Sequence, residues 1–228
     1  MKPLRVDLTE KLLEAYKVMP QLRQFNSREA TKEELQSYHD PLYVSYLETW
    51  VNPQPQNLIT QLPPVLEEDT HKQDVKIGDK FNINCGDDCP GFSNLYHYCK
   101  MAAGSSLMGA DLLIAEMSNV VVNWMGGYHH ARKAEAQGFC YVNDIVLSIL
   151  ELLKVHQRVL YVDIDVHHGD AVQQAFEHTN RVMTVSFHQF EPGFFPTTGA
   201  LDEVGVGTGR YYSVNVPLKR GIDDISYF

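Results

Sequence analysis

The sequence predicts an α/β protein in which helices flank a parallel sheet. After Gly91, long segments with apolar residues at helical spacing alternate with short apolar runs, and this alternation is typical of α/β folds. Runs such as Val-Leu-Tyr-Val (159–162) and Val-Met-Thr-Val (182–185) are apolar at consecutive positions. Such runs favour central strands that helices cover on both faces. Polar motifs follow two of the predicted strands directly, where α/β sheets carry their functional sites.

The first third of the chain is predicted to be helical. Apolar residues recur at helical spacing over residues 4–16, and Thr31 with Glu34 forms a capping box for a second helix that includes Leu35. Four prolines between residues 52 and 64 exclude regular helix and sheet there. We expect that segment to be a surface connection.

Two helices and four strands are predicted for the rest of the chain. The helices are expected at residues 93–117 and 141–154. The strands are expected at residues 120–124, 158–164, 181–187 and 211–216.

Composition restricts the possible partners and compartments. Nineteen Lys and Arg against 29 Asp and Glu give a formal net charge of −10, which argues against direct binding of nucleic acid phosphates. A basic partner such as a lysine-rich peptide fits better, although a modest acidic excess most often serves solubility alone. No apolar run approaches the roughly 18 residues of a membrane helix, and the start does not resemble a signal peptide.

The cysteines indicate an intracellular protein, cytosolic or nuclear. They lack the paired CxxC spacing of a structural zinc module, and a chain of 228 residues does not need disulfides to stabilise it. We therefore expect reduced thiols at all four positions, which are Cys85, Cys89, Cys99 and Cys140.

Asp163, Asp165 and His167 stand at alternate positions at the end of a predicted strand. In extended chain they point to one side, while Ile164 and Val166 face the core. A carboxylate and a neutral imidazole are typical ligands of catalytic zinc, which takes three protein ligands and keeps one position open for water. We expect Asp165 and His167 to supply two of them. A helix-capping Asp beside a hydrogen-bonded His is the simpler alternative, but the full motif DxDxHHGD disfavours it.

His129 and His130 follow two glycines after the predicted strand at 120–124. Adjacent histidines suit proton transfer near neutral pH, and a carboxylate on the second ring nitrogen fixes the tautomer. Asp163 and Asp170 are the available carboxylates. A His-His pair alone is more often structural than catalytic, but proximity to a metal site favours the catalytic interpretation.

Phe139 and Phe195 stand in predicted loops, where two aromatic faces could hold an aliphatic chain. From these segments alone, a Phe that anchors its loop to the core is an equally good interpretation. The acidic loop at residues 85–90 is a poor zinc or redox motif and offers only its acidity.

Taken together, the motifs GGYHHA, GFCYVND, YVDIDVHHGD, VMTVSFH and FFPTTG resemble the class I histone deacetylases over essentially the whole chain. The resemblance implies the arginase/deacetylase fold, a three-layer arrangement with catalytic zinc at the base of a narrow tunnel. It also implies one catalytic domain over residues 1–228, cut short at both ends. In that family Asp165 and His167 correspond to zinc ligands, and His129 and His130 to the active-site pair.

The resemblance also implies roles for the neighbouring residues. Asp163 and Asp170 would orient the histidines, and Asp88 would bind substrate backbone amides at the tunnel rim. The tunnel around the acyl-lysine methylenes would be lined by Gly138, Phe139 and Phe195. A structural monovalent cation, K⁺, would be held by backbone oxygens around Asp163, Asp165, His167, Ser186 and Phe187.

Some features depart from the family pattern. The third zinc ligand, an Asp, and the Tyr that stabilises the transition state would lie downstream of Phe228, and a first strand would lie upstream. Asp223 and Asp224 belong to a segment that the family does not use for metal. Tyr128 and Ala171 replace the family's usual apolar residue and Gly, which we expect to be tolerated. The 228-residue chain alone is expected to be inactive.

The resemblance implies hydrolysis of acetyl-lysine in histone tails or other proteins, and transcriptional repression in the nucleus with corepressor subunits; a cytoplasmic location is also compatible. Two alternatives remain. A deacetylase of small acetylated amines would not need Asp88, and a non-catalytic corepressor scaffold would not need intact His129, His130, Asp165 and His167.

Overall fold

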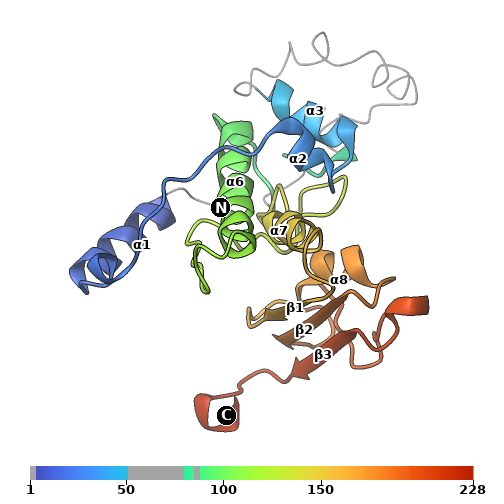
Figure 1. The fold of residues 1–228 in the computed structure, drawn as a ribbon. Helices are drawn as coiled ribbons and strands as arrows, with labels where there is room; N and C mark the ends of the chain where they lie inside the picture. The colour runs from blue at the N-terminus through green and yellow to red at the C-terminus, as the bar shows by residue number, and fades with distance from the viewer. Residues whose placement is uncertain (1–3, 51–79, 85–87, 228) are drawn as a thin grey trace, which may run out of the picture. The chain divides into compact units, whose positions relative to one another are not determined.

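The computed structural model describes residues 4–50, 80–84 and 88–227, drawn as a ribbon in Figure 1. The chain forms two compact units, Met1–Ser148 and Ile149–Phe228. The expected surface connection at residues 52–64 and the expected thiol of Cys85 lie outside the described residues. A single domain over residues 1–228 stays a prediction.

The N-terminal unit is helical in its described part. Its helices are α1 (Leu4–Ala15), η1 (Met19–Gln21), α2 (Lys32–Gln36), α3 (Pro41–Thr49), α6 (Leu95–Ile114) and α7 (Asp144–Leu152), the last of which continues into the second unit. The predicted helices at 4–16, 93–117 and 141–154 are confirmed with somewhat shorter ends. Helix α3 was not predicted, although Asp40 caps it and Pro41 occupies its first turn.

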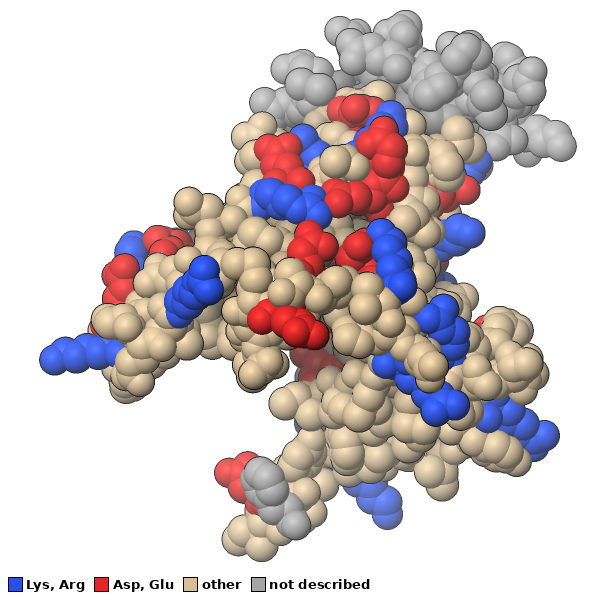
Figure 2. Space-filling view, viewed as in Figure 1, with Lys and Arg blue, Asp and Glu red and all other residues tan. Residues whose placement is uncertain are grey.

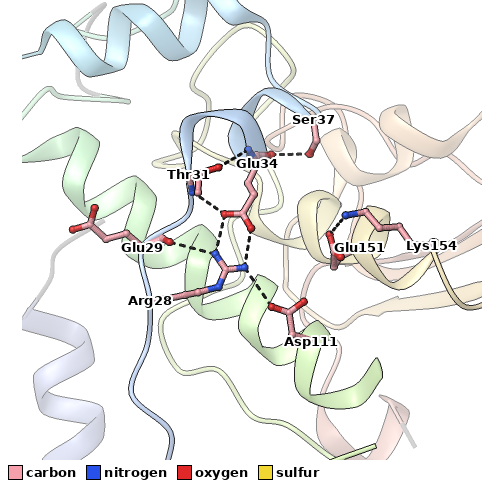
Figure 3. Close-up of polar contacts among 8 residues, drawn as sticks. All are labelled: Arg28, Glu29, Thr31, Glu34, Ser37, Asp111, Glu151 and Lys154. Atoms are coloured by element: carbon pink, nitrogen blue, oxygen red, sulfur yellow. Dashed lines mark hydrogen bonds and ion pairs between the residues drawn. The ribbon is translucent and has the colours of Figure 1, made fainter. Parts of the chain in front are cut away.

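The capping box of α2 is confirmed and belongs to a larger polar network. Thr31 accepts a hydrogen bond from the backbone of Glu34, whose carboxylate accepts one from the backbone of Thr31. Arg28 donates to both carboxylate oxygens of Glu34 at 2.8 Å and to Asp111 of α6 at 3.3 Å (Figure 3). Figure 2 shows acidic and basic side chains beside one another on the visible face around α2. These pairs join the segment before α2 to helix α6.

The core of the N-terminal unit lies between α3, α6 and α7. Its fully buried members include Leu35, Tyr43, Leu47, Phe81, Leu95, Leu107 and Leu147. Small residues on α6 let the preceding chain approach, and Ala30 donates a backbone hydrogen bond to Lys100 of the helix. A Cβ atom at Gly104 would lie 2.0 Å from the carbonyl oxygen of Arg28, so this contact requires glycine.

The second unit contains a parallel three-stranded sheet. Its strands are β1 (Val159–Asp163), β2 (Val182–Gln189) and β3 (Ser213–Leu218), in the order β1-β2-β3. Figure 1 shows them side by side. Asp163 at the end of β1 is in register with Ser186 of β2. Helix α8 (Asp170–Phe176) packs against β2, and two short helices follow, η4 (Gly207–Gly209) and α9 (Asp224–Tyr227). The predicted parallel sheet with flanking helix is confirmed.

Two expectations about strands are wrong in the described structure. Residues 120–124 form no strand, and the side chains of Val120 and Val122 are exposed. The three consecutive valines there favour a strand by composition, but composition alone supplies no neighbouring backbone to pair with. Strand β1 lies at an edge of the three-stranded sheet, and its Leu160 and Val162 side chains are exposed rather than covered.

None of the helices in the described part of the chain is long and apolar enough to cross a membrane.

Gly104→Ala should destabilise the N-terminal unit by about 1–3 kcal/mol, because the added Cβ meets backbone that can move only with its own hydrogen-bonded segment. The matched control is Gly109→Ala on the same helix. There the Cβ would lie 3.3 Å from a side-chain methyl of Val121, and we expect a change within about 1 kcal/mol. Urea unfolding of both variants checks this; equal stabilities would contradict the assigned close approach.

Candidate active site

The loop after β1 is shaped by two aspartates that bind the backbone just ahead of them. Asp163 is buried and accepts a hydrogen bond from the backbone N–H of Asp165 at 3.0 Å. Asp165 in turn accepts one from the backbone N–H of His167 at 2.8 Å. Such local bonds replace an extended ladder. The expected row in extended chain is therefore wrong, and Ile164 and Val166 are exposed instead of facing the core.

The turn nevertheless brings the two expected zinc ligands together. Nδ1 of His167 lies 3.1 Å from Oδ1 of Asp165, and both side chains are partly exposed. Two ligand atoms bound tetrahedrally to one zinc ion at about 2.0–2.2 Å would be about 3.3–3.6 Å apart, slightly more than this hydrogen-bonded separation. A small rearrangement of the two side chains would let both bind one zinc ion. No group of three His, Cys, Asp or Glu suited to a metal occurs among the described residues, so a third ligand would come from elsewhere.

Two aromatic rings hold the imidazole of His167. The ring of Phe194 is stacked on it at 5.3 Å between centroids and 10° between planes. Phe195, expected to line the tunnel, meets it edge-on at 5.6 Å. Phe194 was noted only as part of the FFPTTG loop. The structure adds a role for it, because the stacked ring restricts the rotation of the candidate ligand.

A buried polar network lies behind this loop and was missed by sequence reasoning. His168 is buried, and burial lowers the pKa of its imidazole, so the neutral ring is favoured. Its ring contacts that of His188, which is also buried. The hydrogen-bond partners of the two rings are Thr198 and Gln173 for His168, and Ser186 and the carbonyl of Gly199 for His188. The second His of the HHGD motif, His168, was the one sequence feature that could have indicated this network.

The histidine pair lies in the N-terminal unit. His129 and His130 are both buried, with ring centroids 3.9 Å apart and planes at 47°. The preceding Tyr128 is also buried, and its hydroxyl pairs with that of Tyr98 at 2.5 Å. A tyrosine is thus tolerated at this position because its hydroxyl finds a partner. Burial raises the pKa of Tyr128, which keeps the hydroxyl neutral.

Three expected substrate-binding residues come together in the same unit. The Asp88 carboxylate accepts a hydrogen bond from the backbone N–H of Gly138 at 2.9 Å. Phe139 follows with a left-handed backbone (φ 65°) and an exposed ring. An isolated bridge between Gln137 and Cys140 closes this tight turn. The hydrogen bond therefore joins the acidic segment at Asp88 to the turn that carries the exposed ring of Phe139.

The expected site residues thus form three local groups. Asp88, Gly138 and Phe139 make one, and His129 with His130 makes another. The third is in the second unit and contains Asp163, Asp165, His167 and Phe195, with Ser186 and Phe187 on β2 and Asp170 at the start of α8. That Asp163 and Asp170 orient the histidines stays a prediction, as does the cation site.

Comparison with known proteins identifies the family of the chain. A model of the histone deacetylase domain matches residues 1–228. The chain belongs to this family. It is 50% identical to histone deacetylase B of Dictyostelium discoideum over 227 residues, all of this chain and 49% of that protein. It is 45% identical to histone deacetylase 1 of Homo sapiens, of which it covers 43%, and 44% identical to histone deacetylase 9 of Arabidopsis thaliana, of which it covers 49%.

The chain therefore spans less than half the length of these histone deacetylases. The family membership confirms the resemblance expected from the five motifs. The three described cysteines, Cys89, Cys99 and Cys140, are free and buried. Burial raises the pKa of the Cys89 and Cys140 thiols to about 12, so neither favours the thiolate that metal binding needs.

His39 supports the histidine loop of this deacetylase domain from the N-terminal helices. It is buried, its Nε2 accepts a hydrogen bond from the backbone of Asn143, and its Nδ1 lies 3.3 Å from the carbonyl oxygen of Lys133. Burial lowers the pKa of the imidazole to about 4. The neutral tautomer with a proton on Nδ1 satisfies both contacts.

His39 should make the domain sensitive to acid. Between pH 6.5 and 4 the unfolded chain protonates this residue and the folded one does not. Its contribution is therefore complete above pH 6.5 and is lost as the pH falls toward 4, by about 3 kcal/mol in total. His39→Gln keeps an acceptor and should reduce the difference in unfolding free energy between pH 7 and pH 4 by that amount, in urea titrations.

The matched control is His156→Gln, because His156 is exposed. We expect this variant to keep the pH dependence of the unmodified chain. The same pH dependence in the His39→Gln variant would show that His39 is not the buried neutral group described here.

Proposed function

We propose that the chain forms part of a zinc-dependent lysine deacetylase that acts on histones. The observation that carries the proposal is the Asp165–His167 pair, whose candidate ligand atoms lie 3.1 Å apart in a chain that belongs to the histone deacetylase family. The reaction would cleave the acetyl amide of a lysine side chain with water and release lysine and acetate. The relatives named histone deacetylases support this chemistry.

In this proposal Asp165 and His167 hold the zinc ion. When bound, zinc acts as a Lewis acid that polarises the acetyl carbonyl and makes water more acidic. His130 takes the proton from the attacking water and later delivers it to the leaving amine, while buried His129 assists electrostatically. Asp163 and Asp170 would fix the tautomers of the pair. Backbone oxygens around Asp163, Asp165, His167, Ser186 and Phe187 would hold the structural K⁺.

Substrate binding would use the two segments of the N-terminal unit that carry Asp88 and Phe139. The exposed ring of Phe139 and the ring of Phe195 would contact the lysine methylenes, and Asp88 would accept hydrogen bonds from peptide amides. An acidic group beside an exposed aromatic face suits a peptide better than a small acetylated amine. The net charge of −10 also suits a lysine-rich histone tail.

We further propose that the protein works in the nucleus as a repressor, within a corepressor complex. This follows from the proposed substrate, because acetylated histone tails are found on chromatin. The alternative of a scaffold without catalysis is not favoured, since Asp165, His167, His129 and His130 are all present.

Substitution of His130 and substitution of His167 should have different effects in the full-length protein. His130→Ala should lower kcat by about 10²- to 10⁴-fold while zinc stays bound, because this residue transfers protons and is not a ligand. His167→Ala should lose zinc itself. Metal analysis and release of acetate from an acetyl-lysine peptide measure both effects.

His178→Ala serves as the matched control, because that side chain is 72% exposed and lies outside the three groups. It should keep both zinc and turnover. Loss of zinc from His130→Ala with retention in His167→Ala would invert the ligand assignment.

Asp88→Ala should weaken peptide substrates selectively. Loss of charge-assisted hydrogen bonds to substrate amides should lower kcat/KM for an acetyl-lysine peptide by about 10- to 100-fold. A small acetyl-lysine analogue without backbone amides should lose far less, which separates the substrate contact from any disturbance of the Gly138 bond. The exposed Asp202→Ala is the control. Equal losses on both substrates would remove the role assigned to Asp88.

A further inference from the structure

Two adjacent residues at the start of α7 hold the backbone on both sides of the histidine pair. They are Asn143 and Asp144, and the pair lies at 129–130. Both belong to the GFCYVND motif, to which the proposed reaction assigns no role. All of these residues lie in the N-terminal unit.

The Asp144 carboxylate holds the segment before the pair. It accepts hydrogen bonds from the backbone N–H of Tyr128 at 2.8 Å and of Gly127 at 3.1 Å, and one from the Ser106 hydroxyl at 2.5 Å. The side chain is buried, and among the described residues it makes no ion pair with Lys or Arg. A Cβ atom at Gly126 would lie 2.3 Å from Oδ2 of Asp144. The glycine before the loop is therefore needed for this contact.

The Asn143 side chain holds the segment after the pair. Its Nδ2 donates to the carbonyl oxygen of Ala131 at 3.0 Å, and its Oδ1 accepts from the backbone of Val146, which caps α7. The backbone N–H of Asn143 donates to His39. Asn143 is fully buried, so both ends of its amide are used inside the protein.

Helix capping alone does not account for this arrangement. Asn143 already caps α7 through Val146, whereas Gly127, Tyr128 and Ser106, which donate to the Asp144 carboxylate, lie outside the helix. A buried carboxylate is costly, and burial raises its pKa, while the three donors act in the opposite direction. This buried carboxylate bonds the segment that directly precedes His129 and His130.

We propose that Asp144 and Asn143 are positioning residues for the His129–His130 pair, fixing the backbone that precedes and follows it. The functional consequence rests on the proposed deacetylase activity, because the pair must meet the attacking water and the leaving amine in one geometry. Displacements well below the size of a side chain are costly for such groups. Neither residue touches substrate.

The experiment is NMR on the 228-residue chain, with amide hydrogen exchange and the imidazole resonances of His129 and His130 as readouts. Asp144→Ala should speed exchange at Gly127 and Tyr128 by on the order of 10- to 100-fold, because two bonds to a charged acceptor are lost. It should also shift both imidazole signals and weaken the cross-peaks between the rings. Asp144→Asn keeps an acceptor and should stay within about tenfold of the unmodified chain, with the imidazole signals largely restored.

Asn143→Ala tests the other side, and should shift the imidazole signals while exchange at Gly127 and Tyr128 changes little. The matched control is Asp40→Ala. Asp40 is also an Asp at a helix start, where its carboxylate caps α3 by accepting from Leu42. Its loss should lower global stability by about 1 kcal/mol and leave the imidazole signals in place.

In the full-length protein, Asp144→Ala and Asn143→Ala should lower kcat at least about tenfold with KM nearly unchanged, as expected for misplaced proton-transfer groups, and Asp144→Asn should recover most of that loss. If Asp144→Ala does not fold, Asn143→Ala still decides the question. Imidazole signals that stay in place in every folded Ala variant of Asp144 and Asn143, as in Asp40→Ala, would overturn the proposal. Absence of deacetylation by the unmodified protein would instead contradict the proposed function and leave the NMR result to judge the positioning.

Discussion

Hydrogen bonds from backbone N–H groups to aspartate carboxylates shape three loops of the candidate site. Asp163 and Asp165 bend the chain after β1, Asp144 holds the glycines before the histidine pair, and Asp88 holds the turn before Phe139. Loops of this kind have no ladder partners of their own, so the carboxylates satisfy donors that would otherwise be buried without a partner. The same bond also fixes where the next functional side chain points.

Burial of a carboxylate is unfavourable, and this limits where such hydrogen bonds can shape a loop. A buried carboxylate loses hydration, and only several well-placed donors offset that loss. Asp144 has such donors, and Asp163 accepts from both the Asp165 backbone and the Tyr161 hydroxyl. The carboxylate of Asp165, which is expected to bind metal, is instead exposed and makes one short turn contact with the backbone. Asp144 and Asp163 are thus buried among their donors, whereas Asp165 is exposed.

The sequence predicted elements that depend on local patterns. The capping box at Thr31 and the helical spacing in α1, α6 and α7 were sufficient for those helices, and apolar runs located β1 to β3. The strand expected at 120–124 failed because a run of valines says nothing about a pairing partner. The extended row from Asp163 to His167 failed because aspartate competes for the backbone two residues ahead.

Features that depend on distant contacts could not be read from the sequence. His39 is separated from Asn143 by 104 positions, and their hydrogen bond appears only when α7 packs near α2. His168 follows β1 and His188 lies on β2, so the two rings meet only when these strands pair in parallel. Asn143, His168 and His188 stand in the quoted motifs, but their roles depend on burial, which local pattern does not give.

The most direct test of the account is X-ray absorption spectroscopy on the zinc-loaded full-length protein. The account predicts a first shell of nitrogen and oxygen ligands at about 2.0–2.2 Å, with the multiple-scattering signature of one imidazole from His167 and no sulfur. A zinc–sulfur shell at about 2.3 Å would contradict it, because the metal would then be held by cysteine thiolates rather than by Asp165 and His167.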